Sequence, residues 1–273
     1  MTFATQDSLN WAVAPAALTA TLDNGSQVEV PGKVAQVRSD NGRVLGITSP
    51  TYEVYQNANL KALVEPLIQE GVLKIVTQGY LGKGEKVFIQ AEMTQGYRIV
   101  GEDHKGMMTL LNSHDGSSTL AAGVTDQRVI CSNTFAMALK SMSHKIRHNG
   151  DIYSKALEIT ETIQFVNEGM EKFGEAAEIL ATTKCNEETL DSLLSYAFKR
   201  EDVTTLRPRN QIVEFYRNGV GTEGKTLWDG LNGLTQWVTH NSSKKEGTRF
   251  ASTNFGKGSE VTRRFMNSAL SLA

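Results

Sequence analysis

Two short stretches of the chain combine residue types that could do chemistry. The first is Asn112-Ser113-His114-Asp115-Gly116, where an imidazole and a carboxylate, both ordinary ligands for divalent ions, stand side by side. A metal site needs further ligands, and the other histidines in this half of the chain are His104, His144 and His148. Asn, Asp and Gly also suit a structural turn, in which the polar side chains bond to backbone and glycine takes a positive φ. We expect the structural role.

The second stretch, Gly219 to Thr226, matches the phosphate-loop pattern GxxxxGK[ST] letter for letter. A phosphate loop follows a buried parallel strand and opens a helix. The preceding segment, Gln211 to Tyr216, is a poor strand with Glu214 in its middle, and little chain follows Thr226.

A nucleophilic cysteine is also not expected. Cys131 follows two apolar residues, where a buried thiol is inert. We therefore expect no metal or nucleotide cofactor, and a binding protein in preference to an enzyme.

Positive charge gathers where the middle of the chain lacks acids. No Asp or Glu lies between Asp126 and Asp151. This stretch and its edge contain the candidate nucleic-acid-binding residues Arg128, Lys140, Lys145, Arg147 and His148. Such a run favours contact with phosphates, although an ordinary solvated face would explain it equally well.

The hydrophobic pattern predicts an α+β fold with an antiparallel, β-rich first half. Extended runs punctuated by Pro31-Gly32 and Asn41-Gly42 predict an opening hairpin, and apolar residues from Leu60 to Ile68 predict one short helix. Further strands are expected over 73–78, 86–93, 105–111 and 128–131. The predicted divisions are an α+β core over 1–148, a long helical segment over 149–205 and a basic helical region over 206–273.

The second half should be helical. Apolar residues spaced by four and three, from Ile152 to Leu180, predict one long helix with a seam. The seam could pack within the chain or against a second subunit, and a homo-oligomer is expected. Asn186 is a good N-cap for a further helix ending near Lys199. The tail from Lys244 to Arg264 is basic and rich in glycine, which suits a flexible segment lying near phosphates or near the acidic helix.

The chain should be cytoplasmic. It begins without the basic start and apolar run of a signal peptide, and no stretch has the roughly 18 apolar residues that a membrane helix needs. Cys131 and Cys185 are far apart and form no CxxC pair, which fits two free thiols in a reducing compartment.

Several motifs together resemble the phage- and plasmid-encoded family called domain of unknown function 932. The matching positions are Asn112, Ser113, His114, Asp115 and Gly116, the strand end with Cys131, Asn133 and Thr134, and the block with Thr226, Trp228 and Asn232. Gly233 replaces the usual alanine, and Trp237 replaces the usual tyrosine. The resemblance covers roughly residues 30 to 273 and implies a phage, prophage or plasmid origin in a bacterial cell.

A looser similarity concerns the order of elements. A hairpin, the run Tyr52 to Asn57, a short helix, a twisted set of strands and a helix resemble the core of single-strand-annealing recombinases, the superfamily of Red-beta and the Rad fifty-two protein. The resemblance implies single-stranded DNA as a partner. We therefore expect a DNA-binding protein, for which the resemblance implies a strand-annealing role in recombination. The alternatives are a protein-interaction or host-takeover factor, or a metal- or nucleotide-dependent hydrolase.

Overall fold

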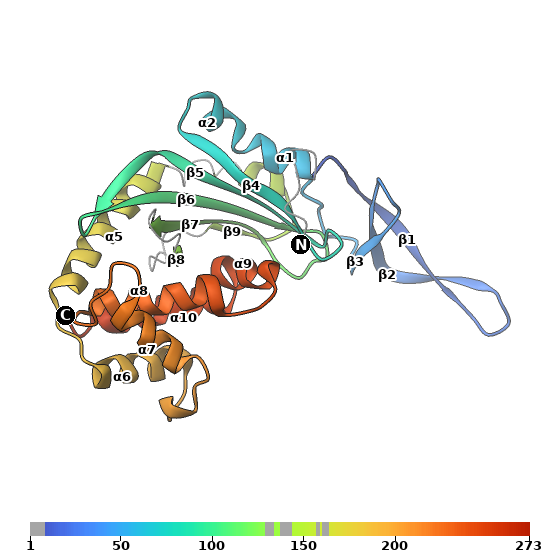
Figure 1. The fold of residues 1–273 in the computed structure, drawn as a ribbon. Helices are drawn as coiled ribbons and strands as arrows, with labels where there is room; N and C mark the ends of the chain where they lie inside the picture. The colour runs from blue at the N-terminus through green and yellow to red at the C-terminus, as the bar shows by residue number, and fades with distance from the viewer. Residues whose placement is uncertain (1–8, 129–133, 137–143, 157–158, 160–163) are drawn as a thin grey trace. The chain divides into compact units, whose positions relative to one another are not determined.

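A computed structural model describes residues 9–128, 134–136, 144–156, 159 and 164–273. It confirms the predicted α+β class, with antiparallel sheets in the first half and helices toward the C-terminus (Figure 1). The chain divides into two compact units. The first unit comprises 1–94, 108–123 and 143–164, and the second comprises 95–107, 124–142 and 165–273. Each unit is built from three stretches of the chain, because long strands run from one unit into the other.

A three-stranded antiparallel sheet opens the first unit. Its strands are β1 (Val13–Thr21), β2 (Gln27–Arg38) and β3 (Val44–Thr48), in the order β1-β2-β3. The predicted turn at Asn41-Gly42 connects β2 to β3, with Gly42 at a φ of 69°. The prediction for Pro31-Gly32 was wrong: these residues lie inside β2, where the register with β1 shifts. Proline has no N–H to donate, so a bulge accommodates it.

The second sheet has the strand order β4-β5-β6-β7-β8, with β9 pairing with β7. Its strands are β4 (Leu73–Leu81), β5 (Lys86–Ile99), β6 (Glu102–Ser113), β7 (Leu120–Arg128), β8 (Thr134–Ala136) and β9 (His144–Ile146). The expected strand over 128–131 overlaps β7 only at Arg128; residues 129–131 lie outside the described residues. Strands β5, β6 and β7 each continue from one unit into the other.

The predicted short helix between the sheets is divided in two. Helix α1 (Asn57–Ala62) and helix α2 (Glu65–Gln69) are separated at Leu63 and Val64. Pro66 explains the division, because proline suits the first turn of a new helix and cannot donate within a continuing one. Leu60, Leu63, Val64, Leu73 and Ile89 are all buried and contribute to the core of the first unit.

Helices dominate the later part of the chain. Helix α3 (Ile152–Ala156) belongs to the first unit. The others are α5 (Gln164–Thr182), α6 (Glu187–Phe198), η2 (Val203–Thr205), α7 (Arg209–Asn218), α8 (Leu227–Gln236), the π-helical turn η3 (Trp237–Asn241), α9 (Glu246–Phe255) and α10 (Lys257–Leu270). The predicted cap is confirmed, because the Asn186 side chain accepts from the N–H of Thr189 and α6 ends at a left-handed Lys199. None of the described helices is long and apolar enough to cross a membrane.

The seam from Ile152 to Leu180 packs within one chain wherever its side chains are described. Ile152, Ala156, Ile159, Met170, Phe173, Ala177 and Leu180 are all buried. Residues 157–158 and 160–163, which include Ile163, lie outside the described residues, so the single long helix is seen only as α3 and α5. Burial in the single chain removes the described part of the seam as a surface for a second subunit.

The basic tail is helical rather than flexible, which corrects the expectation for residues 244–264. Helix α10 buries Val261, Phe265 and Met266 against its neighbours, so an amphipathic face holds it in place. The Arg264 Nε donates to the backbone carbonyl of Ala197 at 2.7 Å, at the end of α6. The tail was expected to lie near phosphates or near the acidic helix. Arg264 contacts the acidic segment, where a cation suits the C-terminus of α6.

Gly233 permits a very close approach of α7 and α8. A Cβ atom at this position would lie 2.8 Å from the backbone nitrogen of Tyr216 and 2.9 Å from the carbonyl oxygen of Ile212. Real Cβ atoms almost never come so close, and the obstructing atoms are backbone. The departure from the family's usual alanine is thus explained by helix packing in this chain.

We predict that Gly233→Ala destabilises the protein, although alanine is the better helix former and is usual in the family. Overpacking should cost about 1–3 kcal/mol, outweighing the roughly 1 kcal/mol gained in helix propensity. Gly174→Ala in α5 is the matched control, since its Cβ would meet only Ile99 Cγ1 at 3.8 Å. That control should be neutral or stabilising in urea unfolding. Equal midpoints for the two variants would contradict the packing argument.

Candidate functional site

The Asn112-to-Gly116 motif ends β6 in a turn that its own side chains stabilise. The Asp115 Oδ1 accepts from the Ser113 hydroxyl at 2.6 Å and from the backbone N–H of Ser117 at 2.9 Å. These bonds keep the pKa of Asp115 below its usual value despite partial burial. Gly116 takes a φ of 73°, as predicted for the structural role. Gly46 lets the turn lie against β3, because a Cβ there would be 2.5 Å from Asp115 Cα.

His114 is buried in the first unit, where a chain of hydrogen bonds holds it. Its Nε2 lies 2.9 Å from Asn57 Oδ1, and the Asn57 amide donates to the carbonyl of Trp11 at 3.0 Å. Because the amide oxygen can only accept, His114 donates from Nε2 and keeps a lone pair on Nδ1. That Nδ1 has no hydrogen-bonding partner among the described residues. Burial lowers the pKa of His114 to about 4, helped by the nearby His148.

Asn112 connects the same turn to the segment before α1. Its amide donates to the carbonyl of Tyr55 at 2.6 Å, and the Tyr52 hydroxyl donates to the carbonyl of Ser113 at 2.5 Å. Burial raises the pKa of Tyr52 well above its usual value, so the hydroxyl remains a donor. The motif therefore attaches β6 to residues almost sixty positions earlier. Sequence reasoning missed these partners, although the polar run from Tyr52 to Asn57 was a visible signal.

His148 is a buried structural histidine and not a surface cation. Its ring stacks on Tyr52 with centroids 4.8 Å apart and planes 15° apart. Its Nδ1 donates to the carbonyl of Glu53 at 3.0 Å, while Nε2 has no partner among the described residues. Burial lowers the pKa of His148, so the ring is neutral near pH 7. A neutral ring supplies no positive charge for a phosphate, and the predicted nucleic-acid contact of His148 stays a prediction.

A polar hollow of about 360 Å³ lies beside the motif, entirely within the first unit. The Tyr52 and His148 rings form part of its lining. The remaining lining residues supply hydroxyl, amide, guanidinium and backbone groups, from Ser49, Thr51, Gly116, Ser117, Ser118, Thr119, Arg147 and Asn149. This composition suits a polar or anionic group better than an apolar ligand.

Strand β9 and the residues after it determine which basic side chains reach solvent. Lys145 and Arg147 are exposed, whereas Ile146 and His148 between and after them are buried. This alternation places the two cations on the same side, as expected for extended chain. Arg147 lines the hollow.

Several predicted site residues cannot be placed. Lys140 lies outside the described residues, and so do Cys131 and Asn133 of the family motif. Arg128 ends β7 and Thr134 begins β8, but their side chains are not described. Of the five predicted nucleic-acid-binding residues, the structure thus brings Arg147 and His148 together at the hollow and leaves Lys145 exposed two residues away.

The second motif block forms the start of α8 and has a structural explanation. The Thr226 hydroxyl accepts from the N–H of Asp229, and the Asp229 carboxylate accepts from the N–H groups of Thr226 and Lys225, each at 3.0 Å. Trp228 is buried, and the buried Asn232 amide donates to the carbonyl of Trp228. A capping box of this kind satisfies the free N–H groups at a helix start.

The phosphate-loop look-alike lacks the structural context of a phosphate loop. It follows helix α7, not a strand, and Asp229 already accepts from the backbone N–H groups that a phosphate would need. Lys225 is exposed and paired with Glu223 at 2.7 Å. These contacts support the sequence argument against nucleotide binding at Gly219–Thr226.

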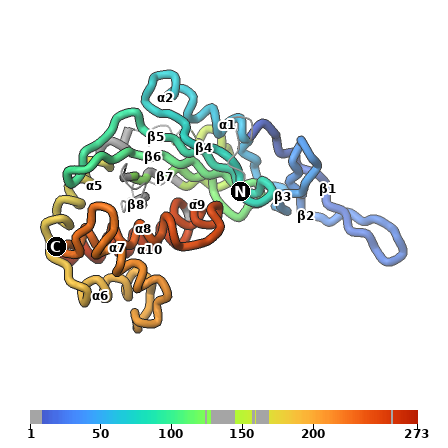
Figure 2. The backbone as a smooth tube through the Cα atoms, in the orientation of Figure 1, coloured from blue at the N-terminus to red at the C-terminus, as the bar shows by residue number. Residues whose placement is uncertain are grey.

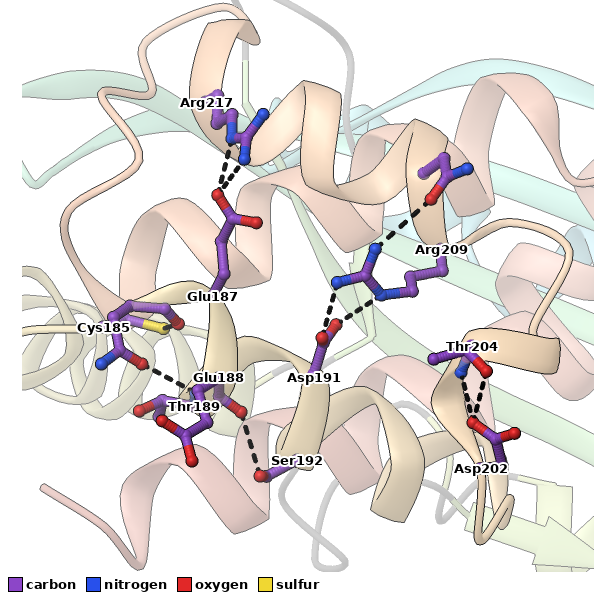
Figure 3. Close-up of polar contacts among 12 residues, drawn as sticks. Cys185, Glu187, Glu188, Thr189, Asp191, Ser192, Asp202, Thr204, Arg209 and Arg217 are labelled. Carbon is purple, nitrogen blue, oxygen red and sulfur yellow. Dashed lines mark hydrogen bonds and ion pairs between the residues drawn. The ribbon is translucent and has the colours of Figure 1, made fainter.

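Charged pairs connect α7 to α6 next to that loop (Figure 3). Arg209 donates through two nitrogens to the two carboxylate oxygens of Asp191, and Arg217 donates to Glu187. A second hollow of about 630 Å³ lies there, lined by Lys184, Cys185, Tyr216 and Lys225 among others. Burial raises the pKa of the Cys185 thiol to about 11, so the thiol is protonated and unreactive.

No metal centre emerges from the described ranges. Within them, no group of three or more His, Cys, Asp or Glu side chains could hold a metal ion. His104 Nδ1 and Asp126 Oδ2 lie 2.5 Å apart, and both side chains are fully buried in the second unit near Phe173 and Trp228. Enclosure among aromatic rings gives this pair the character of a core polar contact.

The comparisons with known proteins agree with the motifs. A family model described as "Domain of unknown function (DUF932)" matches residues 44–263, and the chain belongs to this family. Searches of curated proteins and of solved structures find no match. The family assignment covers both motif blocks, the hollow and helices α5 to α9 in full.

We predict that acid destabilises the protein partly through His114. The pKa of His114 is about 4 in the folded protein and 6.5 in the unfolded chain, so the unfolded chain binds the proton more tightly. The contribution of His114 to the free energy of unfolding is therefore complete above pH 6.5 and is lost as the pH falls toward 4. The loss should be about 3 kcal/mol, because each pKa unit corresponds to about 1.4 kcal/mol. Urea unfolding between pH 7.5 and 4 measures this loss.

The variant His114→Gln keeps an N–H donor for Asn57 and cannot take up the proton. It should show a shallower pH dependence than the parent, whatever its stability at pH 7. His240→Gln controls for the loss of an exposed histidine. Parallel pH profiles for His114→Gln and the parent would show that His114 does not contribute.

Proposed function

We propose that this protein, of phage or plasmid origin, binds single-stranded DNA at the polar hollow of its first unit. The observation that carries the proposal is the position of Lys145 and Arg147, two exposed cations on one side of an extended segment, beside a hollow that offers hydroxyls and backbone groups. Arg, Lys, Ser and Thr side chains and backbone N–H groups are the usual partners of phosphate oxygens.

The spacing of the two cations favours one extended strand as the ligand. Residues two apart in a strand are separated by about 6.6 Å, which is of the same order as neighbouring phosphates along a single strand. Duplex recognition usually needs an element that enters a groove, and a hollow of this size offers none. The proposal includes no base-specific contact, so sequence preference should be weak.

Local charge limits the expected affinity. Asp115 precedes Gly116 of the lining, and Asp151 follows Arg147 by four residues. Both carboxylates keep their negative charge while they accept hydrogen bonds, Asp115 within the turn and Asp151 from the N–H of Ser154 at the start of α3. Binding should therefore be in the micromolar range at low salt and should weaken as salt rises, because each phosphate contact releases counterions.

The test is fluorescence anisotropy with labelled single-stranded oligonucleotides of several sequences. Lys145→Ala combined with Arg147→Ala should lower affinity for all of them alike. It should reduce the slope of log K against log salt by about 0.7 for each lost contact. The fold should survive because both side chains are exposed. Lys33→Ala combined with Lys74→Ala removes the same charge from exposed positions of β2 and β4 that do not line the hollow.

Two outcomes would reject the proposal. One is no binding by the parent protein at micromolar concentration and about 50 mM salt, where even non-specific binders show affinity. The other is an equal loss in the two double variants, which would show that only net charge matters. If the protein binds single-stranded DNA, the same pair of variants is used to measure annealing of complementary strands, the activity that the recombinase resemblance implies.

The main alternative is a protein-interaction role without nucleic acid. One observation favours it, which is an exposed β-ribbon that carries few charges, formed by β1 and the first part of β2. The alternative uses different residues from the proposed DNA site, so the two can be tested separately.

A further inference from the structure

The ribbon formed by β1 and residues 27–33 of β2 is solvent-exposed on both faces. In β1, every residue after Val13 is exposed except Leu18, which is half-buried. In β2, residues 27–33 are exposed except Val30, which is half-buried, and continuous burial begins at residues 34–38, where β3 joins. Figure 2 shows the ribbon in blue extending beyond the rest of the first unit. Neither face therefore rests on the core of its own unit.

The ribbon exposes more apolar surface than an isolated hairpin tolerates well. Leu22 is 47% exposed and Val28 is 43% exposed, and the alanines at 14, 16, 17 and 20 are exposed as well. A two-stranded ribbon alone is marginally stable in water, whereas three or more strands can be independently stable. A ribbon of this length is expected to be completed by further strands.

Charge indicates which partner would complete it. Strand β1 contains no charged residue, and the whole of residues 13–33 contains Asp23, Glu29 and Lys33, a net charge of -1. This balance disfavours phosphate as a ligand. Exposed edge strands usually carry charges or bulges that prevent pairing; β1 carries no charge, and its protection is limited to Pro15 near its start and the register shift between Ala17 and Thr19.

We propose that β1 pairs edge to edge with β1 of a second copy of this chain, forming one continuous antiparallel sheet about a twofold axis that is four-stranded along the ribbon. A twofold interface brings the same strand from each copy together in antiparallel orientation, so it must be self-complementary. The Ala- and Thr-rich strand meets this condition, because no like charges face each other. Residues 16–21 are the pairing segment, since Pro15 has no N–H to donate.

This interface replaces the helical seam as the basis of self-association. The described seam residues are buried in the single chain, whereas β1 forms an edge of its sheet. The inference concerns different residues from the proposed DNA site and stands or falls independently of it.

The first experiment is light scattering during size-exclusion chromatography of the full chain at several concentrations. We expect a dimer, twice the chain mass of 29.9 kDa. Ala20→Lys places a charge on β1 in both copies and should convert the dimer to a monomer. Val28→Lys places the same charge on the directly opposite residue of β2, at the far edge of the ribbon, and should remain dimeric.

The second experiment tests the geometry by cross-linking. Single cysteines introduced one at a time at residues 16–21 should give an oxidised dimer at the positions nearest the twofold axis. Glu29→Cys on β2 and the parent protein serve as controls for Cys131 and Cys185. A parent that is monomeric at tens of micromolar, a dimer that survives Ala20→Lys, or cross-linking from β2 but not β1 would each overturn the proposal.

Discussion

The hydrogen bond between His114 and Asn57 is the constraint on which the arrangement of the first unit depends. Both side chains are buried, so each polar atom must find a partner inside the protein or pay a desolvation cost. The Asn57 amide nitrogen donates to the carbonyl of Trp11, and its amide oxygen accepts from His114. Asn57 thus connects the segment at Trp11 to the end of β6. Three segments that are distant in sequence are thereby held by one side chain.

This network explains why the motif contains the residues it does. Asn112 reaches the carbonyl of Tyr55, and Asp115 closes the turn, so each polar residue satisfies a backbone group or another side chain. Arg38 adds a further contact on the Trp11 ring, 4.1 Å from its centroid, while its guanidinium pairs with Asp40. The side chains of the motif therefore connect separate segments of the first unit, and the hollow lies beside these connections.

Local signals in the sequence predicted elements whose chemistry is local. The Asn186 cap, the Asn41-Gly42 turn and the positive φ of Gly116 each depend on a few neighbouring residues. Strand β1 escaped prediction because both of its faces are exposed, so its sequence has no alternation to detect. Strand β7 was missed because Gly123, which lies inside it, resembled a turn residue.

The burial of His148 escaped prediction for a similar reason. Strand β9 has three residues, which is too short for periodicity to show which side chains face the core. The partners of the motif were also beyond local reasoning, because Tyr52, Tyr55 and Asn57 lie far from it in sequence. The predicted turn of the motif is confirmed, whereas the identity of its partners depends on tertiary packing.

The two buried histidines contribute no positive charge beside the hollow near neutral pH. Burial favours the neutral form of both rings, and each has one nitrogen without a partner among the described residues. Arg147 lines the hollow and Lys145 is exposed two residues before it, so these two cations carry the charge on which the proposed DNA site depends. In that proposed role, salt weakens a phosphate contact because binding releases counterions. His148, stacked on Tyr52, forms part of the lining beside Arg147, whereas His114 belongs to the hydrogen-bond network of the motif.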